Sequence, residues 1–305
     1  MSQDQIVIRD HVGDVQFITD DLVRFWQAFD QAQNALDPAS VYQRKYLGPG
    51  SAGLQDFAQI NEFDAASIAK MVKSYPNFFA AIRSNTLSLI RDDRIQSQIK
   101  THFENLKRLY PPAQFQDVYF VIGALNSGGT VSANGLLMGT EINARDASTP
   151  IEELSPWLQA NTGSLEGLVR LVVHEAVHTL QHLTGTSLEI TGRSLLWKAL
   201  MEGGADFVTT LATGQEPPSP FFKYGLEHEH DLWQEFSSIM DGTNISEWIY
   251  NGDRSTNRPA DLGYFIGYRI LEAYYNRTPD KQKAIAEILV IRDPEEILIE
   301  SGYNP

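Results

Sequence analysis

The pattern His-Glu-x-x-His at residues 174–178 constrains this chain more than any other feature of its sequence. The surrounding apolar residues predict a helix, on which His174 and His178 share one face, one turn apart. Two imidazoles in this arrangement suit a zinc ion. Glu175 lies beside them, where its carboxylate reaches a metal-bound water and acts as a general base without ligating the ion. The alternative is a buried amphipathic helix whose histidines only form hydrogen bonds.

A second predicted helix, over residues 193–213, offers the rest of such a site. It follows the first helix closely enough to turn back, so that Glu202 supplies the third ligand of a catalytic zinc set with one open position. Asp206, one turn later, is placed to hold the free N–H of a ligating imidazole. The alternative is that Glu202 and Asp206 are two exposed acids on a helix.

Two pairs of glycines predict close helix packing. Gly203 and Gly204 each weaken their helix by about 1 kcal/mol relative to alanine, so we expect another helix to approach them closely. Gly263 and Gly267 recur at a spacing of one turn in a later helical segment and favour the same interpretation.

The segment around that second glycine pair also holds the candidate oxyanion donors. Hydrolysis through a tetrahedral intermediate needs a hydrogen-bond donor near the developing negative oxygen. We expect Tyr264 or Tyr268 to serve, and Arg269 to brace an acidic neighbour. His228 is an outside candidate, because the cluster at residues 227–230 is also explained as a solvated helix start or as a second metal cluster.

The remaining chain predicts an α+β fold in which helices predominate. Residues 118–122 and 136–142 are short β-branched and aromatic runs typical of strands, joined by a glycine-rich loop. We expect a single domain over residues 1–305, with a helical layer at 1–116 and a catalytic core with a small sheet at 117–305. Helical patterns in the first part cover residues 22–36, 54–60, 68–72 and 78–109, and the charged run at 91–94 is either a solvated face or a break between two helices.

Three residues are candidate N-caps, namely Thr19, Ser164 and Asp293, and Gly185 ends the helix of His174.

Composition excludes several classes of partner. A net charge of −15 and a pI of about 4.8 disfavour nucleic acid and anionic lipid surfaces. No run approaches the length of a membrane span, and no basic segment followed by an apolar run marks a signal peptide. We therefore expect a soluble chain, cytoplasmic as written, or periplasmic if a signal has been removed. With 0 cysteines, redox chemistry does not choose the compartment, and the sequence gives no oligomeric state.

The metal motifs carry a family resemblance. His174-Glu175-x-x-His178 with Glu202 and Asp206 is similar to the gluzincin pattern of zinc metallopeptidases, in which the later acid orients one of the histidines. More closely, the chain resembles a bacterial family of predicted zinc-dependent proteases of unknown function that is related to gliding-motility lipoproteins. Relatives often begin with a secretion or lipoprotein signal, which this sequence does not show. The likeness runs through residues 21–26, 117–122, 126–129, 139–141, 263–269 and 301–303.

These features predict a zincin-like zinc metallopeptidase that hydrolyses peptide bonds. Zinc activates water, and Glu175 takes its proton and passes it to the leaving amine. We expect the substrate backbone to pair with an edge strand near residues 135–141, as in zincins. Two alternatives remain: an inactive zincin-like module for zinc binding or envelope assembly, and a helical scaffold without metal.

Overall fold

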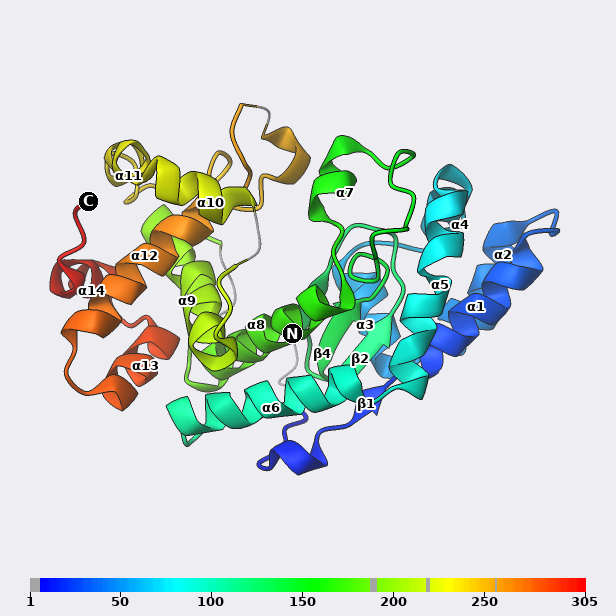
Figure 1. Cartoon of the computed structure of the whole chain (residues 1–305), viewed down its shortest axis with the longest axis horizontal. Helices are drawn as coiled ribbons and strands as arrows, with labels where there is room; N and C mark the ends of the chain where they lie inside the picture. The colour runs from blue at the N-terminus through cyan, green and yellow to red at the C-terminus, as the bar shows by residue number, and fades with distance from the viewer. Residues whose placement is uncertain (1–5, 187–190, 218–219, 256) are drawn as a thin grey trace. The chain divides into compact units, whose positions relative to one another are not determined.

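The computed structural model of this chain describes residues 6–186, 191–217, 220–255 and 257–305 (Figure 1). The residues cluster into two units. Unit 1 comprises Met1–Phe103 and Gln114–Ala176, and unit 2 comprises Glu104–Ala113 and Val177–Pro305. The fold is α+β and predominantly helical, as predicted. The division into a layer and a core at residue 117 stays a prediction.

Unit 1 contains a small mixed sheet with the strand order β1-β2-β4-β3. The three strands β1 (Phe17–Ile18), β2 (Val118–Val121) and β4 (Leu136–Gly139) run parallel, and β3 (Gly129–Val131) runs antiparallel to β4. Both predicted strands are confirmed. The placement of residues 135–141 at an edge was wrong, because β4 is paired on both sides and buried, whereas the half-exposed β3 forms the edge.

The helices of unit 1 follow the predicted pattern with two differences. The long helical series over 78–109 is interrupted at residues 92–93, the break that the charged run had suggested. Leu36 lies outside the first helix and is fully exposed, because that helix already ends at Ala32. The elements are η1 (Val12–Asp14), α1 (Asp20–Ala32), α2 (Pro38–Tyr42), η2 (Gln43–Leu47), α3 (Ala52–Ile60), α4 (Ala65–Ser74), α5 (Pro76–Arg91) and α7 (Pro156–Asn161), while α6 (Arg94–Leu109) and α8 (Leu165–Leu183) each contribute residues to both units.

An aromatic core holds unit 1 together. Phe25 on α1 is fully buried and packs its ring 5.0 Å from Trp26 and 5.2 Å from Tyr46, centroid to centroid. The Tyr46 hydroxyl then joins this core to the sheet, since it donates to the Ile122 carbonyl at 2.6 Å and accepts from the Ile122 amide at 2.8 Å. The end of β2 is thereby fixed by a buried side chain.

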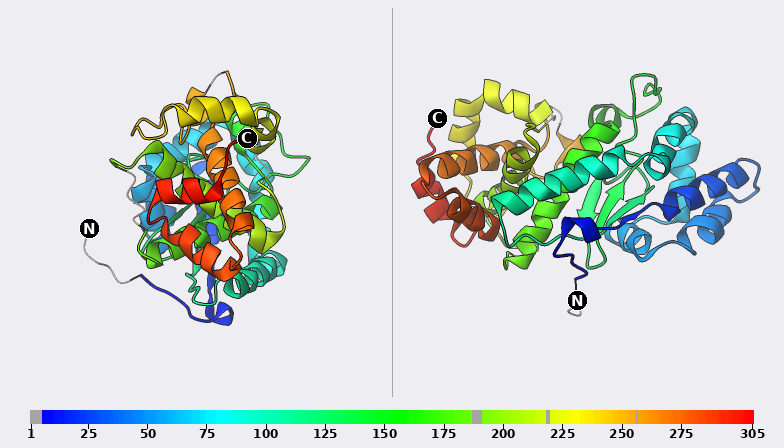
Figure 2. Two further views of the ribbon diagram at one scale, coloured as in Figure 1. Left: turned by 90° about the vertical axis from the view of Figure 1, so that its left-hand side faces the viewer. Right: turned by 60° about the horizontal axis from the view of Figure 1, so that its bottom comes forward.

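Unit 2 is built around a close pair of helices. The helices α9 (Leu195–Thr213) and α12 (Leu262–Arg277) pack against each other at two glycines. A Cβ atom added at Gly267 would overlap the Ala199 carbonyl, and one added at Gly203 would overlap the Tyr268 amide. The predicted close approach is confirmed at these positions. The helices α13 (Lys281–Val290) and α14 (Pro294–Ser301), orange to red in Figure 2, pack on this pair, and α10 (Pro220–Glu227), α11 (Glu229–Ser237) and η3 (Gly252–Arg254) complete the unit.

Local capping explains where several helices begin and end. Ser164 precedes α8 and its hydroxyl accepts from the Gly167 amide at 3.5 Å, and the helix ends before Gly185, whose φ is 98°. Asp293 caps α14 through two backbone amides at 3.0 Å. Thr19 occupies the N-cap position of α1 without a side-chain bond to the helix. None of the described helices is long and apolar enough to cross a bilayer.

Candidate metal centre

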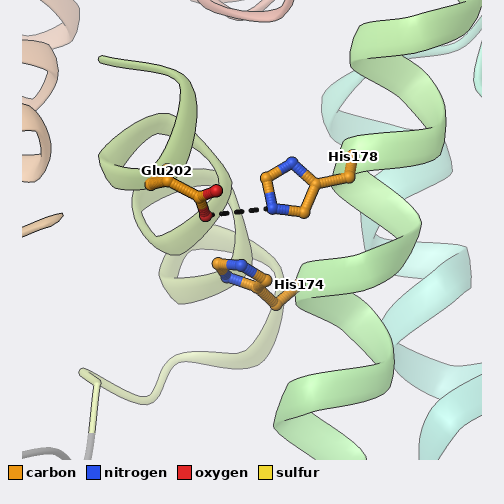
Figure 3. Close-up of side chains that lie close together, drawn as sticks. All are labelled: His174, His178 and Glu202. Carbon is orange, nitrogen blue, oxygen red and sulfur yellow. Dashed lines mark hydrogen bonds and ion pairs between the residues drawn. The ribbon is translucent and has the colours of Figure 1, made fainter. Parts of the chain in front are cut away.

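The three predicted ligands lie together in the structure. His174 and His178 project from α8, and Glu202 projects from α9 toward them (Figure 3). One ligand atom from each residue lies within 4.8 Å of the others. All three residues are buried, with 7%, 9% and 5% of their surface exposed. Two nitrogen ligands and one carboxylate oxygen therefore converge in a site from which water is largely excluded.

Hydrogen bonds orient the His178 ring. Its Nδ1 lies 2.7 Å from Oε1 of Gln181, and the Gln181 amide is itself fixed because its Nε2 donates to the Met201 carbonyl at 2.9 Å. The Gln181 oxygen can only accept, so Nδ1 carries the hydrogen. The other ring nitrogen, Nε2, lies 3.2 Å from Oε2 of Glu202.

This donor set fits a zinc ion. With the hydrogen on Nδ1, a neutral imidazole would present the Nε2 lone pair to the carboxylate oxygen, and a metal cation between these two acceptors would be favourable. His178 Nε2 and Glu202 Oε2 are 3.2 Å apart, and the ligand atoms of all three residues lie within 4.8 Å of one another, so these residues could hold one divalent ion such as zinc. The hydrogen bond from Nδ1 to Gln181 is the outer contact that ligating histidines commonly make.

Two tyrosines surround the Glu202 carboxylate. The Tyr250 hydroxyl donates to Oε1, the oxygen opposite the one that faces His178. The Tyr264 ring lies 6.3 Å from the Tyr250 ring, centroid to centroid. Burial raises the pKa of Tyr264 well above its ordinary value, and the charges of Glu202 and Asp206 raise it further. Tyr264 therefore stays protonated and is a permanent hydroxyl donor beside the centre.

Glu175 is the predicted general base. It is 8% exposed and follows His174 directly on α8. A methyl group on Gly129, the first residue of β3, would lie 3.2 Å from its Cγ and 3.3 Å from its Oε1. The Glu175 side chain therefore reaches the backbone of the edge strand, and the glycine leaves room for it.

The other predicted residues have separate environments. Asp206 is buried on α9, one turn after Glu202, and its charge reaches Tyr264. Tyr268 is 4% exposed and packs edge-on against Phe207 and Phe222.

Arg269 and His228 belong to the surface of unit 2. Arg269 forms ion pairs with Glu229, at 2.7 Å, and with Glu272, so the predicted acidic brace is confirmed. His228 is exposed, stacks on the Tyr224 ring and places Nδ1 2.9 Å from the Tyr224 carbonyl. The structure therefore places Tyr264 near the acids of the centre, packs the Tyr268 ring against two phenylalanines, and leaves His228 exposed.

Three residues near the candidate centre were not predicted from the sequence. Gln181 lies one turn after His178 on the same helix, so helical spacing alone would have found it. Tyr250 and Gly129 reach the centre through tertiary structure, from a loop and an edge strand, and no local pattern marks them.

Comparison with known proteins gives a family. No curated protein and no solved structure matches the chain. A family model described as gliding motility protein GldB matches residues 11–305, nearly the whole chain. The chain therefore belongs to the gliding motility protein GldB family.

Proposed function

We propose that this protein is a zinc-dependent metallopeptidase with a zincin-like core. The proposal depends on the buried group of His174, His178 and Glu202. Glu175 lies next to His174 on α8. Bound zinc would polarise the scissile carbonyl and lower the pKa of a water molecule.

Glu175 is the proposed general base and acid. It takes a proton from the attacking water and delivers it to the leaving amine. Its burial and its contact with Gly129 hold the carboxylate at one end of β3. The free edge of β3 offers backbone donors and acceptors to an extended peptide, which would align the scissile bond beside Glu175.

Tyr264 is the proposed oxyanion donor. Its hydroxyl is protonated, lies near Glu202 and has no hydrogen-bond partner among the described residues. It can therefore donate to the negative oxygen of a tetrahedral intermediate, a contribution typically of about 10²–10³ in kcat. Tyr268 remains the second candidate, and its ring packs edge-on against Phe207 and Phe222.

The test combines metal analysis with peptide cleavage. We expect about one zinc per chain in the parent and in Glu175→Gln, with cleavage of a peptide library about 10²–10⁴-fold slower in the variant. His178→Ala should lose zinc. Glu166→Gln, an exposed glutamate on the same helix, is the matched control and should retain both properties. Equal cleavage by parent and Glu175→Gln would reject the mechanism, and a zinc-free parent prepared without chelators would reject the metal site.

A second function is favoured by the family itself. Membership in a gliding motility family, whose model carries a lipoprotein designation, supports a location at the cell envelope and a role in assembly there. In that case the zinc site stabilises an interaction module without turnover. A parent that binds zinc and cleaves no peptide of a broad library would support this function over hydrolysis.

A further inference from the structure

A closed loop carries Tyr250 to the metal centre. The loop spans residues 250–261, of which the structure describes 250–255 and 257–261, and both of its ends, Tyr250 and Asp261, have left-handed backbone, with φ of 54° and 62°. The side chain of Asn251, which is 2% exposed, accepts from the Asp261 amide at 2.8 Å, and Gly263 donates its amide to the Trp248 carbonyl at 2.8 Å. Strained backbone of this kind persists only where surrounding contacts fix it.

The backbone of Tyr250 is held as firmly as its loop. Its carbonyl accepts from Nη2 of Arg254 at 2.7 Å, and its ring packs edge-on against Tyr264. Tyr250 as a residue is 41% exposed, while its hydroxyl donates to the buried Glu202. The loop therefore presents one hydroxyl at a fixed place beside the carboxylate.

This contact makes the two oxygens of Glu202 unequal. Oε1 accepts from the Tyr250 hydroxyl, and Oε2 faces His178 Nε2 at 3.2 Å. A carboxylate without such a donor can rotate and offer both oxygens to a cation, as ligands of calcium commonly do. A four-coordinate zinc site with three protein ligands uses one oxygen of its carboxylate and keeps one position open.

We propose that Tyr250 is a positioning residue that holds Glu202 in one-oxygen coordination and thereby sets the site for a four-coordinate metal. The inference rests on the proposed zinc function. Tyr250 fixes the orientation of the Glu202 ligand, whereas Tyr264 donates the hydrogen bond to the substrate oxyanion. The Tyr250 hydroxyl acts because it occupies the oxygen that would otherwise join the metal and because it fixes the carboxylate plane.

Cobalt is the probe that tests this role, because its visible absorption is strong in four-coordinate sites and weaker in five-coordinate ones. The variant is Tyr250→Phe, which keeps the ring and removes the hydroxyl. The matched control is Tyr275→Phe, since Tyr275 belongs to the same unit and its ring packs on Phe207 and under Lys281. Zinc affinity is measured in parallel by competition with a chromophoric chelator, and thermal unfolding of the metal-free proteins checks that each variant folds.

We expect the parent and Tyr275→Phe to give the strong four-coordinate cobalt spectrum. Tyr250→Phe should give weaker bands and bind zinc about 10–100-fold less tightly, the typical loss for an outer contact to a metal ligand. A Tyr250→Phe protein with the parent's spectrum and zinc affinity would overturn the positioning role and leave the metal site intact. A parent that binds neither cobalt nor zinc would overturn the proposed function and the positioning role together.

Discussion

Glu141 is a carboxylate buried at an energetic cost that can be measured. It follows β4 in unit 1 and is fully buried. Its Oε1 accepts from the Leu125 amide at 3.2 Å, whereas Oε2 has no hydrogen-bond partner among the described residues. Burial raises the pKa of Glu141 from 4.5 to about 7, and hydrogen bonds from the amides of Gly123 and Leu125 offset this only in part. The folded protein therefore prefers the protonated acid.

The sign and size of the effect follow from proton linkage. Since the folded pKa lies above the unfolded one, the folded state binds more protons between pH 4.5 and pH 7, and stability falls as pH rises through that window. At about 1.4 kcal/mol per pKa unit, ionisation of Glu141 lowers the free energy of unfolding by about 0.8 kcal/mol at pH 5 and by about 3.3 kcal/mol at pH 8. Glu141→Gln removes this titration.

Urea unfolding of the parent and of Glu141→Gln at pH 5 and pH 8 measures the effect. We expect the variant to gain about 2.5 kcal/mol relative to the parent between the two pH values. The free-energy cost of burying the glutamine amide does not depend on pH, so it cancels when the two pH values are compared. The exposed Glu152 gives the control, and Glu152→Gln should show no such gain. A Glu141→Gln variant whose stability relative to the parent is the same at both pH values would refute the reasoning.

Three other substitutions test contacts described above. Gly267→Ala places a methyl group against a carbonyl of α9 and should lower the free energy of unfolding by about 1–3 kcal/mol, measured by urea denaturation. The control is Gly167→Ala, whose methyl group meets no atom within 4 Å and which should be neutral or stabilise α8 by up to about 1 kcal/mol. Tyr46→Phe leaves the amide and carbonyl of Ile122 without the buried hydroxyl and should cost about 1–3 kcal/mol in the same assay. Gln181→Ala removes the Nδ1 acceptor of the second histidine and should weaken zinc binding about 10–100-fold, measured by chelator competition.

The parts of this protein that depend on local order were predictable from the sequence. The ligands His174 and His178 lie one turn apart on one helix, so their common face follows from helical geometry alone. Glu202 required only that a second helix return past the first. The start of α8 at Ser164 and its end before Gly185 follow from capping chemistry, which acts over a few residues.

The parts that depend on pairing between distant segments were not predictable. Strand β3 has only three residues and begins in a glycine-rich loop, so its pairing with β4 has no signal in its own composition. The contact between Tyr250 and Glu202 joins residues 48 positions apart and depends on the closure of a loop. Exposure of Tyr250 at 41% also resembles that of an ordinary surface tyrosine.

The glycine contact between α9 and α12 has a consequence for motion at the centre. Glu202 immediately precedes Gly203, and Tyr264 lies about one turn before Gly267, so ligand and donor stand next to the point where the two main chains touch. Main-chain atoms have no alternative rotamers, unlike a side-chain contact, which can yield by changing a χ angle. Displacement of the Glu202 backbone relative to the Tyr264 backbone therefore requires a whole helix to bend, and only the side-chain torsions of the two residues remain free to change.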